Sequence, residues 1–215
     1  MFADRRNAGV QLISRLKEYK DQQGGIVLSL PRGGVATGYE IARSLNIPLD
    51  IVIVRKIGFP GQPELAIGAV SETGTVVLNT SIISTYGVPK EYIEREVSRQ
   101  KEEISRRVKL YRKGKRLPSL EGKTVILVDD GVATGATLKS AITTLKEENL
   151  KKLIVALPVA PPGVVKELEQ MVDLFICIET PFDFMAVGSY YHDFTQVSDE
   201  EVINLLERSA KNLSA

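Results

Sequence analysis

The sequence has little of what metal centres and disulfides are usually built from. Its 215 residues include one cysteine, Cys177, and one histidine, His192. A single cysteine excludes an intramolecular disulfide and a cysteine-rich metal site, and a single histidine excludes a histidine-based metal cluster. Cys177 lies in the apolar run LFICI, which favours a buried core thiol over a nucleophile.

Strong net charge and long apolar runs are also missing. The formal net charge of +1 gives no global attraction to nucleic acid or to an anionic membrane. No apolar run approaches the roughly 18 residues of a membrane span, and the start MFADRRNAGV lacks a signal-peptide core. We therefore expect a soluble, cytoplasmic protein that binds no membrane. The 43% apolar content suffices for one α/β domain over residues 1–215.

Strand and helix patterns alternate along the chain. Strands are expected over 25–30, 50–55, 65–71, 75–79, 125–128, 153–159 and 174–178. Helices are expected over 5–20, 35–45, 136–148, 162–171 and 198–213. Repeated strand–helix–strand units predict an α/β fold with a doubly wound parallel sheet.

The segment VILVDDGVATGAT, residues 125–137, has the pattern of a ligand site. Its apolar start predicts a buried parallel strand, and such strands place ligands at their carboxyl ends. The small residues that follow let backbone N–H groups approach a phosphate, which the start of the next helix also favours. Asp129 and Asp130 suit sugar hydroxyls or a divalent cation. No lysine stands where a Walker A loop needs one. The segment predicts a ribose 5-phosphate site.

This segment resembles the signature of the type I phosphoribosyltransferases, which is an apolar strand, two acids and a small-residue loop ending in T-G-x-T. The resemblance implies that Asp129 and Asp130 hold the ribose of 5-phosphoribosyl 1-pyrophosphate (PRPP) and contribute to a Mg²⁺ site. It also implies a loop for the 5′-phosphate, made of Gly131, Val132, Ala133, Thr134, Gly135, Ala136 and Thr137. The order of elements is similar to that of the uncharacterised prokaryotic members of the family.

Two basic segments suit a second anion. Leu30-Pro31-Arg32-Gly33-Gly34 follows the first strand and should face the signature loop. It resembles the family's pyrophosphate loop, which implies pyrophosphate contacts from Arg32 and Gly33. Arg55 and Lys56 end the second predicted strand and could neutralise the same pyrophosphate. The alternative for the Gly-Gly pair is a tight turn that caps the next helix.

Residues 57–74, IGFPGQPELAIGAVSETG, contain enough glycine and proline for a mobile lid. The stretch resembles the flexible loop of adenine phosphoribosyltransferases, which implies that Glu72 is the catalytic glutamate. Glu64, in the same stretch, is the reserve candidate. The alternative is that Glu72 is a turn residue beside Thr73-Gly74.

Residues 181–194, PFDFMAVGSYYHDF, follow the last predicted strand and begin a segment, residues 179–215, that we call the hood. They loosely resemble the 6-oxopurine phosphoribosyltransferases. That resemblance implies base contacts from Phe184 and Val187 and a role for Asp193 at metal-bound pyrophosphate; a plain aromatic core is the alternative. Ala133 stands where those enzymes carry a proton-accepting aspartate, so proton transfer is expected from Glu72, from another residue or from no protein group.

Residues 80–121 form a predicted helical arm that the core sheet does not need. The arm ends in the basic run RRVKLYRKGKR, residues 106–116. Nucleic-acid binding is one interpretation, but charge runs usually lie in solvent. We favour a solvated arm that packs on the domain or on a second subunit, and we expect a homo-oligomer, most simply a dimer, without nucleic acid.

The implied activity is displacement of pyrophosphate from PRPP by a nitrogenous base, as in purine salvage, with Mg²⁺ as cofactor. The fold implied is that of the type I phosphoribosyltransferases, with the hood and the inserted arm. A non-catalytic PRPP sensor and a nucleic-acid-binding regulator are the alternatives, because fold and motif alone do not establish chemistry. The resemblance does not identify the acceptor base.

Overall fold

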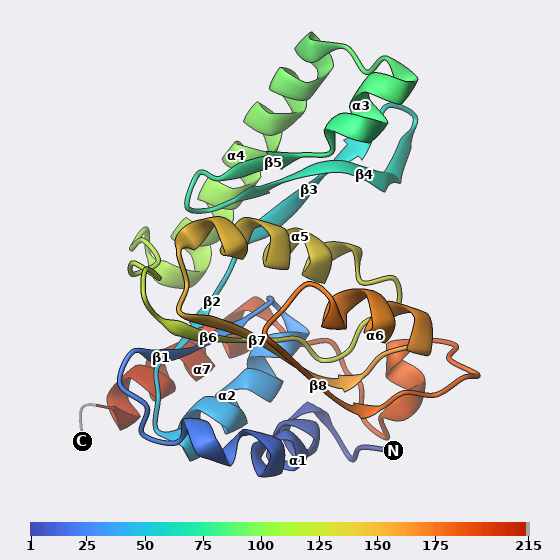
Figure 1. The fold of residues 1–215 in the computed structure, drawn as a ribbon. Coiled ribbons are helices and arrows are strands. Elements are labelled where there is room, and N and C mark those ends of the chain that lie inside the picture. The colour runs from blue at the N-terminus through green and yellow to red at the C-terminus, as the bar shows by residue number, and fades with distance from the viewer. Residues whose placement is uncertain (214–215) are drawn as a thin grey trace. The chain divides into compact units, whose positions relative to one another are not determined.

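The computed structural model describes residues 1–213, apart from the side chain of Glu64. The chain divides into two compact units, whose elements are labelled in Figure 1. The core unit comprises Met1–Ile51, Ser119–Gly135 and Asn149–Ala215, and the second unit comprises Val52–Pro118 and Ala136–Glu148. The second unit therefore contains most of the predicted arm and begins well before it.

A five-stranded sheet forms the centre of the core unit. Its order is β2 (Leu49–Ile51), β1 (Gly25–Ser29), β6 (Thr124–Val128), β7 (Lys152–Val159) and β8 (Leu174–Glu179), and every neighbouring pair is parallel. This confirms the predicted α/β class with a parallel sheet. Gly25 pairs with Thr124 and Ser29 with Val128, so β1 and β6 end side by side. All five residues of β6 are buried, as its β-branched run predicts.

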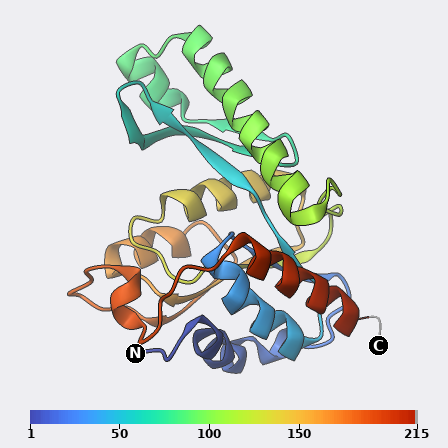
Figure 2. The same cartoon turned by 180° about the vertical axis from the view of Figure 1, so that it is seen from behind.

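The described residues of the core unit form the α-helices α1 (Arg5–Leu16), α2 (Gly33–Leu45), α6 (Pro162–Glu169) and α7 (Asp199–Asn212). The Asp4 side chain caps α1 by accepting a hydrogen bond from the Asn7 amide at 2.7 Å. Ser198 caps α7 in the same way, from the Glu201 amide at 3.1 Å. Behind the view of Figure 1, α7 lies beside α2 (Figure 2).

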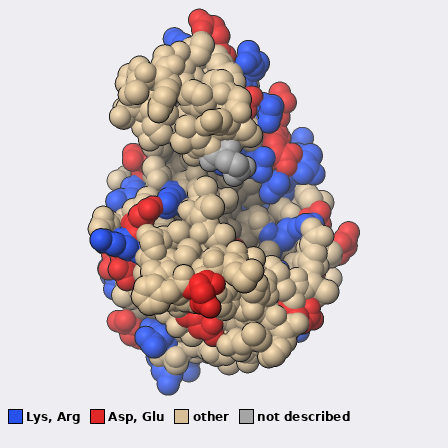
Figure 3. All heavy atoms as spheres, turned by 90° about the vertical axis from the view of Figure 1, so that its right-hand side faces the viewer, with Lys and Arg blue, Asp and Glu red and all other residues tan. Residues whose placement is uncertain are grey.

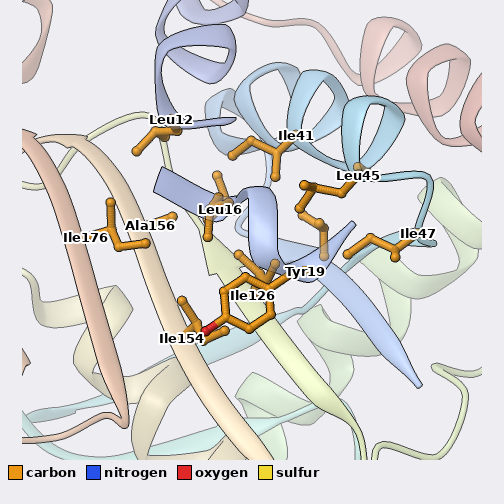
Figure 4. Close-up of a cluster of buried hydrophobic side chains, with 13 residues drawn as sticks. Leu12, Leu16, Tyr19, Ile41, Leu45, Ile47, Ile126, Ile154, Ala156 and Ile176 are labelled. Carbon is orange, nitrogen blue, oxygen red and sulfur yellow. The ribbon is translucent and has the colours of Figure 1, made fainter. Parts of the chain in front are cut away.

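The apolar faces of α1 and α2 meet the sheet in one buried cluster. Figure 4 shows Leu12 and Leu16 of α1 and Ile41 of α2 among side chains of the strands, such as Ile126 and Ile154. Burying each such side chain contributes about 1.5–3 kcal/mol. This cluster anchors the sheet and the helices that present the loops described below.

The second unit has a three-stranded antiparallel sheet. Its order is β3 (Val54–Phe59), β4 (Gln62–Ser71) and β5 (Val76–Leu78). Its helices are α3 (Thr80–Tyr86), α4 (Lys90–Arg112) and α5 (Ala136–Leu145). Helix α4 lies along β3 and β4 (Figure 2), and α5 packs on all three strands. Three short 3₁₀ segments complete the described chain: Lys17–Tyr19, Lys146–Glu148 and Val187–Tyr190.

Residues 57–74 have more strand structure than their glycine and proline content indicates, and β4 contains the predicted strand 65–71. That this stretch is a mobile lid stays a prediction. Most of this stretch forms the β3–β4 hairpin, and the predicted strand 50–55 is divided between β2 and β3 of different sheets. A Cβ at Gly58 would lie 2.7 Å from Pro63 Cα, so the glycine allows close strand contact at a register shift. Buried Ile57, Ile67 and Val70 give the hairpin an apolar face.

Helix α4 carries charges of both signs. Arg99 pairs with Glu96 at 3.3 Å, and both Arg106 and Arg107 reach Glu103 at 2.8 Å. On the face drawn in Figure 3, lysine and arginine side chains likewise lie among aspartate and glutamate side chains. This pairing favours a solvated helix over a basic nucleic-acid surface. Among the described helices, none has the length and apolar character needed to cross a membrane.

Candidate functional site

The loop after β1 lies against the two acids that follow β6. The Leu30 amide donates to the Val128 carbonyl at 3.0 Å and so extends the pairing of the two strands. A Cβ at Gly33 would lie 1.9 Å from Asp130 Oδ2, and one at Gly34 would lie 2.9 Å from Asp129 Cα. Only glycine permits this approach. The structure thus brings together the two glycines and the two acids, as the parallel sheet predicts.

Arg32 lies in the same loop, at the start of α2. The peptide bond between Pro31 and Arg32 is cis. The Arg32 guanidinium lies 3.9 Å from Asp199 Oδ1 of α7 and is about one-third exposed, so this long ion pair leaves it accessible to solvent. A positive charge beside the first turn of α2 suits an anion.

Asp130 is held by both ends of the chain. Its Oδ2 accepts a hydrogen bond from Arg5 Nε at 2.6 Å, and its backbone carbonyl accepts one from the Tyr191 hydroxyl at 2.5 Å. Arg5 Nη1 also donates to the Thr195 carbonyl at 2.7 Å, and the Arg5 guanidinium carbon lies 3.8 Å from the centre of the Phe194 ring. No local spacing in the sequence marks Arg5, Tyr191 or Phe194, so these contacts are seen only in the folded chain.

The surroundings of the acid pair disfavour the ionised form of Asp129. Burial raises the pKa of Asp129 well above its ordinary value, and the neighbouring Asp130 carboxylate raises it further. The Asp130 amide donates to Asp129 Oδ1 at 2.9 Å. Burial, followed by the Asp130 charge, also raises the pKa of Tyr191, so its hydroxyl remains a hydrogen-bond donor.

The predicted phosphate loop is only partly accessible. Val132 is buried, and its amide donates to the Val159 carbonyl at 3.1 Å. Gly131 has φ +137°, and a Cβ there would lie 2.7 Å from Val187 Cγ1, so glycine is required. Ala133, Thr134 and Thr137 are the exposed residues of the predicted loop. The loop runs through Gly135 in the core unit, whereas Ala136 and Thr137 begin α5 of the second unit.

Arg55 and Lys56 lie within β3 of the second unit rather than at a strand end of the core sheet. Arg55 Nε donates to Gln100 Oε1 of α4 at 3.0 Å. Burial lowers the pKa of Arg55, and the nearby Arg107 charge adds to the effect. Their role as pyrophosphate ligands stays a prediction.

Glu72 takes part in a buried ion pair inside the second unit. Its Oε1 accepts a hydrogen bond from the Ile53 amide at 2.8 Å, and its Oε2 pairs with Arg112 at the end of α4. The side chains of Glu72 and Arg112 are 3% and 8% exposed. This geometry favours an anchoring role for Glu72, and its catalytic role stays a prediction. The side chain of Glu64 lies outside the described part of the structure.

The hood packs against the phosphate loop through Val187. The Phe184 ring stacks on Tyr190 with centroids 5.5 Å apart, and both join the buried cluster around Phe2 and Tyr191. The Asp193 carboxylate is exposed to solvent. Its Oδ1 accepts hydrogen bonds from the hydroxyl and the amide of Thr195, at 2.6 and 2.9 Å, which lower the pKa of Asp193.

A divalent cation fits only part of the predicted ligand set. Within residues 1–213, no group of three histidine, cysteine or acidic side chains is arranged to hold a metal ion. Mg²⁺ is commonly held by one or two carboxylates together with substrate phosphates. The adjacent carboxylates of Asp129 and Asp130 fit that mode, whereas Asp193 does not form such a group with them.

Cys177 is expected to react slowly with thiol reagents. Burial raises its pKa to about 11, and its Sγ lies 3.2 Å from the Glu179 carbonyl. Because the thiolate is the nucleophile, the native protein at about pH 8 should react with a disulfide reagent roughly 100-fold more slowly than the unfolded chain. The absorbance of the released thiol measures both rates. Cys177 is half-buried rather than fully buried as the sequence predicts, and equal rates would contradict the raised pKa of its thiol.

Comparisons with known proteins show the family of the chain. The family described as "Phosphoribosyl transferase domain" matches residues 7–195. The chain is 39% identical over 214 residues to the Mycobacterium tuberculosis (strain H37Rv) protein named "Putative phosphoribosyl transferase Rv0571c", and equally to its strain CDC 1551 counterpart. The match covers 100% of the chain and 48% of each relative, so the chain spans about half the length of these curated proteins.

A solved structure is similar over almost the whole chain. The protein TT1426 from Thermus thermophilus matches with a TM-score of 0.88 and 41% identity, over 97% of this chain and 98% of that chain. The family match spans most of the sequence and includes the β1 loop and the acids after β6. The chain belongs to the phosphoribosyl transferase domain family.

Proposed function

We propose that this chain transfers the phosphoribosyl group of PRPP to a nitrogenous base, a purine, and releases pyrophosphate. The observation that carries the proposal is the contact between the β1 loop and the acid pair after β6, where a Cβ at Gly33 would meet Asp130 Oδ2 at 1.9 Å. An anion-binding loop beside two carboxylates suits a sugar with phosphate groups at both ends. Membership of the family supports the same reaction.

In this proposal the core unit binds the donor at three places. Asp129 and Asp130 accept hydrogen bonds from the ribose hydroxyls. The exposed loop at Ala133 and Thr134 receives the 5′-phosphate, and Arg32 with the first turn of α2 receives the pyrophosphate. Holding the sugar at fixed points supplies the orientation that the displacement needs.

The protein also has to balance charge as the bond to pyrophosphate breaks. Negative charge grows on the leaving group while the ribose becomes oxocarbenium-like. The Arg32 guanidinium and the N–H groups at the start of α2 stabilise the leaving group, and the Asp129–Asp130 pair stabilises the electron-poor sugar. The chemistry that Mg²⁺ supplies when bound is neutralisation of the pyrophosphate oxygens.

The hood is proposed to hold the acceptor. Phe184 and Val187 would contact the base, and the stacked pair of Phe184 and Tyr190 supports an aromatic surface there. Ala133 offers no proton acceptor, and the Glu72 carboxylate is engaged in its ion pair. We propose that the base gives up its proton to solvent or to the leaving pyrophosphate. A homodimer and a cytoplasmic location stay predictions.

Incubating the protein with radiolabelled PRPP, Mg²⁺ and a panel of bases tests the function. We expect pyrophosphate release with at least one purine and little release without a base. PRPP binding without release on any base would support the alternative, a non-catalytic sensor. Absence of PRPP binding would contradict both functions.

A further inference from the structure

Arg5 occupies an unusual place for a residue at the start of a helix. Its side chain is 11% exposed and reaches Asp130, which lies 125 positions further along the chain and is 15% exposed. Arg6, the next residue, is 55% exposed and lies 3.9 Å from Glu201. The two adjacent arginines of α1 thus differ in exposure: Arg6 lies on the surface, and Arg5 is nearly buried against the acid pair.

The Arg5 guanidinium is fixed by groups other than Asp130. The Phe194 ring lies under it at 3.8 Å, and Nη1 donates to the Thr195 carbonyl at 2.7 Å. The β1 loop approaches it as well, because a Cβ at Gly33 would lie 2.9 Å from Arg5 Nε. Stacking on an aromatic ring and donation to a carbonyl together restrict the orientation of the guanidinium. The Asp130 carboxylate therefore accepts its hydrogen bond from a guanidinium whose orientation is fixed.

We propose that Arg5 is a positioning residue for the ribose subsite, holding the Asp130 carboxylate in the orientation that accepts a ribose hydroxyl. The inference rests on the proposed function. An ionised carboxylate has about four acceptor positions, so the hydrogen bond from Arg5 leaves others for the sugar. A nearly buried ion pair is weak grounds for a purely stabilising role, since its desolvation cost offsets its attraction. The start of α1 and the hood residues Phe194 and Thr195 thereby become part of the donor site.

The test separates the two ends of PRPP. Arg5→Gln is titrated with ribose 5-phosphate and, separately, with inorganic pyrophosphate, both with Mg²⁺. We expect the affinity for ribose 5-phosphate to fall roughly tenfold or more, as for a lost charge-assisted hydrogen bond. Pyrophosphate affinity should change by less than about twofold, because Arg5 is proposed to act on the Asp130 carboxylate and not on the pyrophosphate site. A general effect of the lost positive charge would instead weaken the binding of both ligands. Arg5→Lys should retain part of the sugar affinity, and Arg6→Gln should match the wild type.

A double-mutant cycle with Asp130→Asn tests whether Arg5 acts through Asp130. In the Asp130→Asn background, Arg5→Gln should change ribose 5-phosphate affinity by less than about twofold. Thermal unfolding checks that each variant is folded, and Arg5→Lys serves if Arg5→Gln is not. Unchanged ribose 5-phosphate affinity in a folded variant that has lost the Arg5–Asp130 pair, or equal losses for both ligands, overturns the inference alone. A wild-type protein that binds neither PRPP nor ribose 5-phosphate overturns the proposed function with it.

Discussion

Replacing Asp129 and Asp130 together by asparagine is expected to abolish PRPP binding and phosphoribosyl transfer while the fold stays intact. The ribose would lose its charge-assisted hydrogen bond to Asp130 and the carboxyl group of Asp129 beside it, so we expect PRPP affinity to fall at least about a hundredfold. Asparagine has nearly the same shape, and Oδ1 at position 129 can still accept the hydrogen bond from the next amide. Isothermal titration with PRPP and Mg²⁺ measures the loss, and wild-type affinity in the double variant would remove these acids from the site.

The two single variants should differ in stability. Burial and the Asp130 charge raise the pKa of Asp129, so near neutral pH the folded state disfavours its ionised form. Asp129→Asn should therefore leave the free energy of unfolding unchanged or raise it. Asp130→Asn should lower it by about 2 kcal/mol or more, because it removes the charge partner of nearly buried Arg5. Urea unfolding of both variants measures the difference, and a destabilised Asp129→Asn would contradict the first expectation.

Arg112→Leu is expected to lower the free energy of unfolding of the second unit by about 3–5 kcal/mol. The substitution removes the charge partner of Glu72, whose side chain is only 3% exposed. Arg99→Leu is the matched control on the same helix, because Arg99 is 71% exposed and its ion pair should contribute less than about 1 kcal/mol. Chemical unfolding followed by circular dichroism measures both. Equal effects of the two variants would contradict an anchoring role for the Glu72–Arg112 pair.

Glu72→Gln distinguishes an anchor from a catalyst. If Glu72 anchors α4 to the hairpin, this variant should be destabilised, and its turnover should match the wild type well below its unfolding temperature. A folded, stable variant with lowered turnover would instead support the catalytic role predicted from sequence. Measuring unfolding and pyrophosphate release on the same preparation separates the two outcomes.

The core fold follows from sequence patterns that act locally. The buried run of β6, the alternation of strands with helices, and the cap at Ser198 each depend on residues close together in the chain. The meeting of the Gly33 loop with Asp130 also follows, because neighbouring parallel strands end at one edge of the sheet. For this reason the part of the proposed site that binds PRPP could be predicted from the sequence.

Only part of the β3–β4 hairpin could be predicted from the same patterns: the strand expected over 65–71 lies within β4, whereas residues 57–64 were expected to form a loop. Glycine and proline in residues 57–74 signal a loop, but Gly58 and Pro63 instead allow two strands to pack closely. Division of the strand after Ile51 into a second sheet depends on tertiary pairing that no local window contains. The contacts of Asp130 could not be predicted locally either, since Arg5 and Tyr191 lie far from it in the sequence, one before it and one after it.

The contact between Val187 and Gly131 has a consequence for protein engineering. A Cβ on Gly131 would lie 2.7 Å from Val187 Cγ1 and 2.9 Å from Val159 Cγ1, so the three positions share one filled space. A larger side chain at position 187, introduced to alter which base is accepted, would press on the loop that precedes Ala133 and Thr134. The choice of acceptor base and the affinity for the 5′-phosphate would then change together. A designer would have to vary Val159 and Val187 as a pair.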